Sequence, residues 1–387
     1  MPVMPEIGML DEPRLQNTHV SPPHILASMP LEQPPCKDSR GPSIPLPVLP
    51  PDQHAPLQNN LVPQAAKKTH PLHVAVLMGG WSRERCVSLC SGEAVSVALE
   101  QLGHRVTRID MTRNVAAVLV ATKPDVVFNA LHGGEGENGA IQGVLDILGV
   151  PYTHSGVRAS VIAIDKALTK KVLALEGIPM PEGCIVCSED LYIRDPLPRP
   201  YVLKPLNEGS SIGVTVVKAG GRLPEPIARE SLGPWTQFES LLAEPYIPGR
   251  ELTVGVLDDR ALLVTESVPK NHSPVFDFEA KYTVGATDRQ CPAHLPPEIA
   301  AACCDWAERA HKALECSGAT RMDFRWNEEQ GLAGLYLLEV NTQPGLTPTS
   351  LFPEQAAAIG LDYGACLQAM LDSALKKPPL IGPPSSS

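Results

Sequence analysis

Hydrophobic residues recur in short blocks from residue 72 onward, and a turn or a helical pattern follows each block. The apolar block 73–78 predicts a strand that ends at Gly79-Gly80. Small and apolar residues at every fourth position then predict an amphipathic helix that ends at Gly103; they are Cys90, Ala94, Ala98 and Leu102. Further strands are expected at 105–110 and 125–131, with a helix at 139–148. This alternation predicts a doubly wound parallel sheet that binds ligands at the carboxyl ends of its strands.

Two further segments combine helices with antiparallel strands. The first holds a helix at 165–176 and two strands, 201–205 and 214–217, joined by a glycine- and serine-rich loop. The second holds strands at 251–257, 261–268, 321–326 and 335–341, and helices at 297–316 and 362–376. The pattern predicts three α/β lobes, at 71–156, 157–243 and 244–377.

Clustered prolines set the first 70 residues apart from this pattern. Sixteen of the 41 prolines precede residue 72, and they interrupt each apolar stretch before it could pair in a sheet or complete a helical turn. Residues 1–70 are therefore expected to form a disordered tail, and residues 378–387 a frayed end. A secretory signal is disfavoured because no charged start precedes an uninterrupted apolar run. Docking of a proline-recognising partner stays open for the tail.

Charge and cysteine usage narrow the class of protein. The 387-residue chain has a formal charge of −11, which argues against a nucleic-acid binder, since such a protein needs a basic face. The sequence contains no run of 18 or more apolar residues, so no membrane-spanning helix is predicted. The 10 cysteines are expected to be reduced and the protein cytoplasmic, because the chain is large and shows no export signal. The segment 184–187 (Cys-Ile-Val-Cys) is expected to be a buried strand, with a zinc or redox site as the alternative.

The glycine- and serine-rich loop 206–213 is a candidate phosphate site. Its backbone N–H groups could surround a phosphate, and Lys204 supplies a positive charge just before it. The loop lacks the GxxxxGK[ST] spacing of a Walker A motif, so an ordinary hairpin with a mobile tip remains the alternative. The turn at Gly79-Gly80 lacks the GxGxxG fingerprint and its downstream acid, which argues against a nicotinamide oxidoreductase.

Two acids and an amide near the C-terminus form a candidate metal site. Asp323 and Glu339 lie on two apolar strands, and Asn341 shares the face of Glu339 because residues two apart in a strand point the same way. Such an all-oxygen set suits Mg²⁺, whose coordination nucleotide phosphates would complete. Arg321 shares the face of Asp323 and could stabilise a developing oxyanion. Solvent-facing polar positions on a sheet are the alternative, which the turn at 342–345 disfavours because it would hold the cluster at a strand end.

Four separated stretches together resemble the D-alanine–D-alanine ligases of the ATP-grasp superfamily. They are residues 77–88 (LMGGWSRERCVS), 131–139 (LHGGEGENG), 204–213 (KPLNEGSSIG) and 338–351 (LEVNTQPGLTPTSL). The resemblance runs in order from about residue 73 to residue 376 and excludes the tail. It implies a three-lobed ATP-grasp architecture, in which an N-terminal parallel-sheet lobe is followed by central and C-terminal α+β lobes that clasp ATP.

The resemblance implies a nucleotide site between the second and third lobes. Lys166 and Lys204 would contact the phosphates, residues 244–247 would face the adenine, and Glu251 would hold the ribose. The residues implied in ATP binding are Lys166, Lys204, Glu208, Ser211, Glu244, Tyr246, Ile247, Glu251 and Lys281, the last in a loop that would cover the γ-phosphate. Two Mg²⁺ ions, with Mn²⁺ as an alternative metal, would be held by Asp323, Glu339 and Asn341.

On the substrate side, the resemblance implies that Glu84 and His132 bind the ammonium group of the first D-alanine. Ser350 and Leu351 would bind the carboxylate of the second. Arg321 would contact substrate and, with the backbone N–H of Gly345, stabilise the oxyanion. The resemblance also implies hydrogen bonds among Glu84, Ser210 and Tyr282, which would hold the loop that contains Lys281 closed over the site. Related ligases that use D-lactate commonly carry phenylalanine at the tyrosine position, so Tyr282 favours an amine as the second nucleophile.

The implied reaction is ATP-dependent ligation of two D-alanine molecules through an acyl phosphate, for peptidoglycan precursor synthesis. The implied partners are small molecules, without nucleic acid or membrane, and the implied assembly is a homodimer. Two alternatives stay open: an ATP-grasp ligase for another acid and amine, and a silent nucleotide-binding module whose tail recruits partners. The substrate-side residues argue against the first, and the intact key positions argue against the second.

Overall fold

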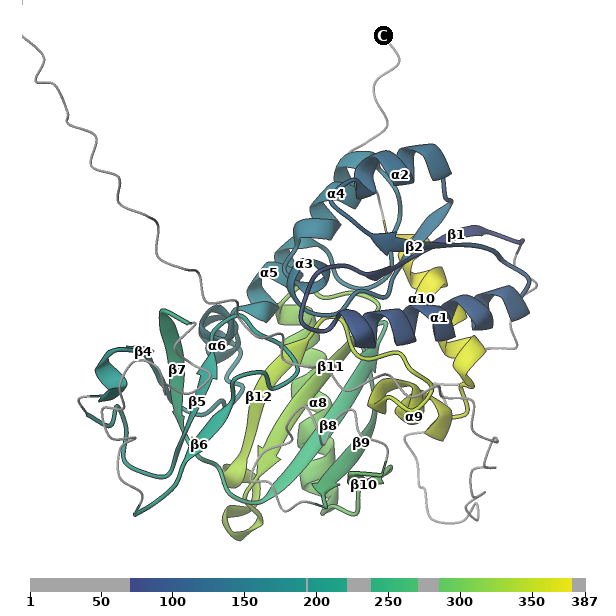
Figure 1. Ribbon diagram of the computed structural model, residues 1–387. Helices are drawn as coiled ribbons and strands as arrows, with labels where there is room; N and C mark the ends of the chain where they lie inside the picture. Colours follow the sequence, from purple (N-terminus) through teal and green to yellow (C-terminus); the bar gives the residue numbers. More distant parts are fainter. Residues whose placement is uncertain (1–69, 193, 221–237, 271–284, 378–387) are drawn as a thin grey trace, which may run out of the picture. The chain divides into compact units, whose positions relative to one another are not determined.

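Figure 1 shows the computed structural model of the protein, which describes residues 70–192, 194–220, 238–270 and 285–377. The chain divides into two units, Met1–Val48 and Leu49–Ser387, and all described residues belong to the second. The tail expected at 1–70, except for its last residue, and the end expected at 378–387 therefore lie outside the described residues.

The first sheet has three parallel strands in the order β2-β1-β3, which confirms the predicted parallel sheet. The strands are β1 (His73–Gly79), β2 (Arg105–Met111) and β3 (Val126–Asn129). Helices cover both faces, as a doubly wound sheet requires: α1 (Arg85–Gln101) and α10 (Tyr363–Lys376) on one face, and α2 (Val115–Thr122) and α4 (Ala140–Leu148) on the other (Figure 1). The hydrophobic pattern did not predict α2 or the short α3 (Gly134–Glu137).

Helix α1 buries only part of the stripe that was expected, since Ala98 is buried and Ala94 half-buried. Cys90 is exposed and Leu102 is 44% exposed, so the prediction that these two residues face the core was wrong. Besides Ala98, the buried face carries the small residues Ser88, Ser91, Gly92 and Ser96 and the apolar residues Val95 and Leu99. A spacing of four drifts around a helix that has 3.6 residues per turn. Gly92 also brings the α1 backbone directly against Met78 of β1, where a side chain would clash.

The second sheet is antiparallel, with the strand order β4-β7-β5-β6. Its strands are β4 (Cys184–Cys187), β5 (Tyr201–Pro205), β6 (Thr215–Val217) and β7 (Ser240–Pro245). The β5–β6 pairing confirms the predicted hairpin. Strand β4 lies at the sheet edge and its Ile185 is 55% exposed, so the prediction of a buried strand at 184–187 was wrong. Three helical segments belong to this region: α5 (Val157–Ile164), α6 (Lys166–Leu175) and the short η1 (Asp190–Tyr192).

The third sheet has five antiparallel strands in the order β10-β9-β8-β11-β12. They are β8 (Arg250–Leu257), β9 (Arg260–Pro269), β10 (Thr287–Gln290), β11 (Ala319–Trp326) and β12 (Leu335–Asn341). The predicted strands of this segment are confirmed to within two residues. Helix α8 (Pro297–Ala313) packs on β8 and β9, and α9 (Leu351–Ala358) also contacts both strands. The turn η4 (Glu328–Gly334) joins β11 to β12.

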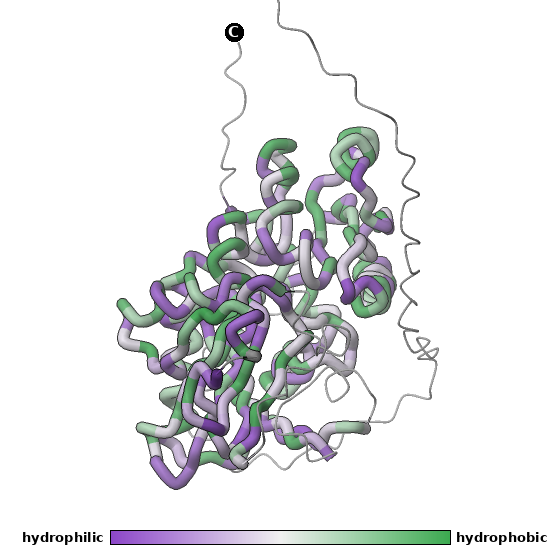
Figure 2. Tube along the Cα trace, turned by 60° about the vertical axis from the view of Figure 1, so that its left-hand side comes forward, coloured by the Kyte–Doolittle hydropathy of each residue, from purple (hydrophilic) through white to green (hydrophobic). Residues whose placement is uncertain are grey.

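Buried apolar residues form four clusters in the described chain, one on each face of the first sheet and one at each of the other two sheets. One of these extends from the first sheet through α10 to α9 and includes Val74, Phe128, Phe352 and Leu367. Hydrophobic and hydrophilic residues alternate along the helices (Figure 2), as expected for helices that cover a sheet on one side only. In the described part of the chain, no helix is both long enough and apolar enough to cross a membrane.

Candidate functional site

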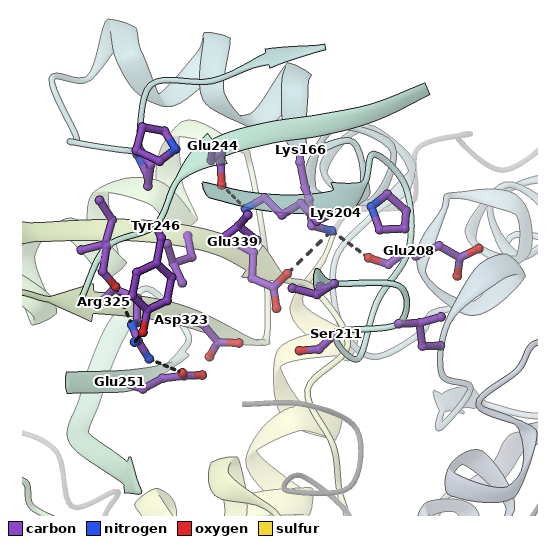
Figure 3. A pocket seen from close by; sticks show the side chains of 18 residues that line it. Lys166, Lys204, Glu208, Ser211, Glu244, Tyr246, Glu251, Asp323, Arg325 and Glu339 are labelled. Atoms are coloured by element: carbon purple, nitrogen blue, oxygen red, sulfur yellow. Dashed lines mark hydrogen bonds and ion pairs between the residues drawn. The ribbon is translucent and has the colours of Figure 1, made fainter. Parts of the chain in front are cut away.

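A pocket lies between the second and third sheets, and charged side chains from both sheets line it (Figure 3). Helix α6, strands β5, β7, β8, β11 and β12 and the loop after β5 all contribute. The predicted site residues that line it are Lys166, Lys204, Glu208, Ser211, Glu244, Tyr246, Ile247, Glu251, Asp323 and Glu339. Val202, Ile212 and Leu338 supply apolar walls, so the pocket combines an apolar lining with a few convergent charges. Asn341 lines a smaller neighbouring hollow that shares Lys166, Glu208 and Glu339 with the first.

The two candidate metal-binding carboxylates lie directly opposite each other. The β11–β12 register pairs Asp323 with Glu339 and Arg321 with Asn341, which confirms that these strands are neighbours. An irregularity follows at once, because Phe324 pairs with Leu337 and leaves Leu338 as an extra residue. Bulges of this kind re-aim side chains beside active sites. Here the bulge lies where Leu338 and Glu339 both line the pocket.

These oxygen donors fit a divalent cation. Asp323 is buried and accepts two hydrogen bonds from Arg321, at 2.9 and 2.8 Å, and one from Thr253 at 3.1 Å. The Lys166 ammonium lies 3.7 Å from the Glu339 carboxylate. Within the described ranges, no cluster of three His, Cys, Asp or Glu side chains could hold a metal, so Asn341 and ligand oxygens would complete the set. Two carboxylates and an amide remain the hard-oxygen chemistry that Mg²⁺ prefers.

A buried glutamate between two lysines forms the opposite wall of the pocket. The Glu244 carboxylate accepts one hydrogen bond from Lys204 and another from Lys170, a residue of α6 that the sequence motifs did not single out. Burial alone would raise the pKa of Glu244, but the two ammonium groups outweigh it and lower the pKa. Lys166 donates a 2.7 Å hydrogen bond to the Glu208 carbonyl at the start of the glycine- and serine-rich loop.

Arg325 is a second pocket residue that the sequence analysis missed. Its guanidinium donates to the Glu251 carboxylate at 3.0 Å, to the Tyr246 hydroxyl at 3.1 Å and to the Ile247 carbonyl at 3.2 Å (Figure 3). It also lies 5.6 Å from the centre of the Tyr246 ring. The only sequence signal was its position two residues after Asp323, on the same strand and face.

The loop after β5 contacts the N-terminal region at the start of α1. Ser210 donates a hydrogen bond to the carboxylate of Glu84, a buried residue at the start of α1. Ser210 and Ser211 have φ angles of 50° and 58°, in the left-handed region that non-glycine residues seldom occupy. Strain of this kind is concentrated at functional sites, where the surrounding structure maintains it.

Two buried ionisable groups lie beside Glu84. The His132 ring is 3.0 Å from the Ser91 hydroxyl, and burial lowers its pKa to about 4, so the ring is neutral near pH 7. Glu137 accepts a 2.8 Å hydrogen bond from the Gly133 N–H. Burial and the nearby Glu84 carboxylate raise the pKa of Glu137 to about 8, which leaves it largely protonated. The positive charge of Arg321 acts on both groups and lowers the pKa of each.

The predicted residues Gly345, Ser350 and Leu351 form a separate group at the start of α9. Ser350 precedes the helix, and its hydroxyl accepts a 3.1 Å hydrogen bond from the Thr347 N–H. Gly345 lies directly against this hydroxyl. The N-terminus of a helix presents unpaired N–H groups and suits a carboxylate. Lys281 and Tyr282, the remaining predicted residues, lie outside the described residues.

Comparisons with known proteins place the chain in one family. Residues 189–372 match the family model described as D-ala D-ala ligase C-terminus, and residues 116–155 match D-ala D-ala ligase N-terminus. The D-alanine–D-alanine ligase of Novosphingobium aromaticivorans is 63% identical over 79% of this chain and 97% of its own length. That of Rhizorhabdus wittichii is 61% identical over 79% of this chain and 98% of its own. A crystal structure of D-alanine–D-alanine ligase from Bacillus anthracis complexed with ATP has a TM-score of 0.64 at 28% identity, covering 79% of this chain and 98% of that one. The fold, the order of the motifs and these relatives together establish that the chain belongs to the D-alanine–D-alanine ligase family.

Proposed function

We propose that the protein joins two D-alanine molecules into D-alanyl-D-alanine at the expense of ATP, as a step in peptidoglycan precursor synthesis. The observation that carries this proposal is the contact between Ser210 and Glu84. It connects the loop beside the charged pocket with the group that contains His132 and Glu137. Two relatives that are more than 60% identical over 79% of the chain are named D-alanine–D-alanine ligase.

The first step transfers the γ-phosphoryl group of ATP to the carboxylate of the first D-alanine. A carboxylate is a poor electrophile, and phosphorylation turns one of its oxygens into a leaving group. In our proposal Lys166 and Lys204 bind the phosphates, Glu251 binds the ribose, and residues 244–247 bind the adenine. The charged lining of the pocket supports these roles. Lys281 would cover the γ-phosphate.

The second step is attack of the second D-alanine's amine on the acyl phosphate, with release of phosphate. Glu84, whose carboxylate is buried, would hold the ammonium group of the first D-alanine together with His132. Arg321 and the Gly345 N–H would stabilise the tetrahedral oxyanion. Ser350 and Leu351 would bind the second carboxylate, since the start of α9 offers unpaired N–H groups.

Magnesium binding is part of the proposal. Asp323, Glu339 and Asn341 would hold two Mg²⁺ ions, or Mn²⁺ in their place, which would neutralise charge on the transferring phosphoryl group. Arg321 and Lys166 form ion pairs with Asp323 and Glu339 of this set.

We further propose a cytoplasmic homodimer with lobes at 71–156, 157–243 and 244–377. An apolar patch on α2 and α4 supports the dimer. Helix α2 contains no charged residue, and together with α4 it exposes Ala116, Ala117, Val120, Ala121 and Ile147. Val120 and Ile147 are 58% and 77% exposed, and they lie on two helices that contact each other.

Phosphate release from Mg·ATP by the purified protein tests the activity. The reaction is compared with D-alanine, L-alanine and D-alanine plus D-lactate, and the product is identified by mass. Phosphate that depends on D-alanine, together with D-alanyl-D-alanine, is expected. Tyr282→Phe is expected to increase the share of the D-lactate product. ATP binding without any turnover would contradict the proposal and favour another ligase substrate or a silent nucleotide-binding module.

A further inference from the structure

Lys170 lies outside every motif of the site, but its ammonium group contacts a carboxylate of the pocket wall. It comes from the middle of α6, one turn after Lys166, and its side chain is 17% exposed. Its ammonium donates to Oε1 of Glu244 and to the Pro181 carbonyl. Glu244 and Pro181 both line the pocket, whereas Lys170 itself does not.

The two oxygens of the Glu244 carboxylate bind two different lysines. Lys170 contacts Oε1 and Lys204 contacts Oε2. The Glu244 side chain is 3% exposed, so water has little access to its carboxylate. Burial lowers the pKa of Lys170, and the Glu244 carboxylate opposes this effect, so the two charges stabilise each other.

We propose that Lys170 is a positioning residue for nucleotide binding: by occupying one oxygen of Glu244, it limits the hold of that carboxylate on Lys204 and leaves the Lys204 ammonium available to the nucleotide. This inference rests on the proposed role of Lys204. With Lys170 absent, Glu244 would keep Lys204 as its single cation in a buried site. The ATP phosphates would then compete against an undivided ion pair, because charges attract strongly where water is excluded.

Removal of the Lys170 ammonium group should weaken the affinity for ATP. Lys170→Met should raise KM for ATP about 10-fold, the effect of one hydrogen bond to a charged group, with kcat nearly unchanged. Lys170→Arg should restore most of the affinity. Lys171→Met, at the exposed next position of α6, is the matched control and should behave as wild type.

A double-mutant cycle separates this role from a structural one through the Pro181 carbonyl. If Lys170 acts through Glu244, adding Lys170→Met to Glu244→Gln should change KM for ATP less than about twofold, since the neutral amide in place of the carboxylate no longer holds Lys204. If Lys170 acts through Pro181, the two effects should multiply instead, and the inference is overturned.

Calorimetric titration of each variant with the non-hydrolysable analogue AMP-PNP, without D-alanine, completes the test. It reports on nucleotide affinity whatever amine the enzyme uses, so a wrong substrate assignment would leave this result intact. Equal affinities of wild type and Lys170→Met would overturn the inference. A tenfold loss that Glu244→Gln suppresses would support it.

Discussion

The Ser210 hydroxyl donates a hydrogen bond to Oε1 of Glu84, a residue 126 positions earlier in the chain. Glu84 precedes α1, and Ser210 lies in the loop between β5 and β6. The contact therefore joins the proposed D-alanine site to the loop beside the proposed ATP site. It makes the position of one substrate sensitive to the conformation of the loop that holds the other.

Removal of this contact should weaken D-alanine use more than ATP use. Ser210→Ala leaves the buried Glu84 carboxylate without one of its donors, and loss of a hydrogen bond to a charged group costs roughly 10- to 100-fold in kcat/KM for D-alanine. Phosphate release at varied D-alanine measures this value. Ser211→Ala is the matched control, because Ser211 lines the nucleotide pocket and should affect KM for ATP instead. An unchanged kcat/KM for D-alanine in Ser210→Ala would show that the contact has no role in catalysis.

Neutralisation of Asp323 should abolish most of the metal-dependent activity. Asp323→Asn removes one charge of the proposed metal site and leaves Arg321 without its bidentate partner. We expect kcat to fall at least about 100-fold and the Mg²⁺ concentration for half-maximal rate to rise. Glu329→Gln, at an exposed position three residues after the end of β11, is the control. Chelation with EDTA should stop the wild-type reaction, and Mg²⁺ should restore it.

Glu137 should make the protein less stable as the pH rises. Its pKa is raised from 4.5 to about 8 in the folded protein, so between these values the folded state holds a proton that the unfolded state has released. The free energy of unfolding should therefore fall across this range by at most about 1.4 kcal/mol per pH unit.

Glu137→Gln removes this titration and should flatten the decline. Denaturant unfolding at several pH values from about 5 to 8 measures the slope for each protein. Glu298→Gln, at an exposed position in the first turn of α8, serves as the control. Parallel slopes for wild type and Glu137→Gln would mean that the buried carboxyl does not hold a proton in this range.

Arg325→Met should impair recognition of the ribose. The substitution removes the 3.0 Å contact that fixes the Glu251 carboxylate, together with the bonds to Tyr246 and Ile247. We expect KM for ATP to rise about 10-fold. The preference for ATP over 2′-deoxy-ATP should also shrink, because a mobile carboxylate discriminates less between them. If KM rises but this preference stays as in wild type, Arg325 supports the pocket without orienting Glu251.

A charge on the apolar patch should separate the proposed dimer. Ile147→Glu places a carboxylate at the most exposed large apolar residue of the patch on α2 and α4, where it would be desolvated on association. Light scattering after size-exclusion chromatography should give a monomer mass for this variant and a dimer mass for the wild type. Leu175→Glu is the control, because Leu175 is 88% exposed at the end of α6, away from the patch. A dimer in both variants would place the interface elsewhere.

Most of the strands and the carboxylate pair were predictable from local pattern, whereas β7 and β10 were not predicted. Asp323 and Glu339 occur in apolar strands whose alternation fixes which side chains share a face, and the register pairs them. Prediction failed where burial depends on what another element covers. Strand β4 has the composition of a core strand, but only β7 pairs with it, so its outer side remains exposed. The buried face of α1 carries serines and a glycine, which a hydropathy pattern assigns to solvent.

Lys170 and Arg325 could not be predicted because their roles come from tertiary contacts. Lys170 meets Glu244 across 74 positions of sequence, and Arg325 meets Glu251 across 74 as well. Neither belongs to a local motif, and each would be read as a solvated charge on a helix or strand. The motifs identified the residues that are expected to contact the ligands. The residues that orient those side chains could be identified only from the tertiary structure.

The packing of α10 links the first part of the described chain to the last. Leu367, Met370 and Leu371 of this helix fill the same core as Val74 of β1 and Phe128 of β3. During synthesis the first three strands leave the ribosome more than 200 residues before α10 does, and until then α10's share of one sheet face, beside α1, is missing. The lobe that carries Glu84 and His132 can therefore reach its final stability only after translation has passed residue 374, and a chain interrupted earlier would present that face to chaperones and proteases instead of to its own last helix.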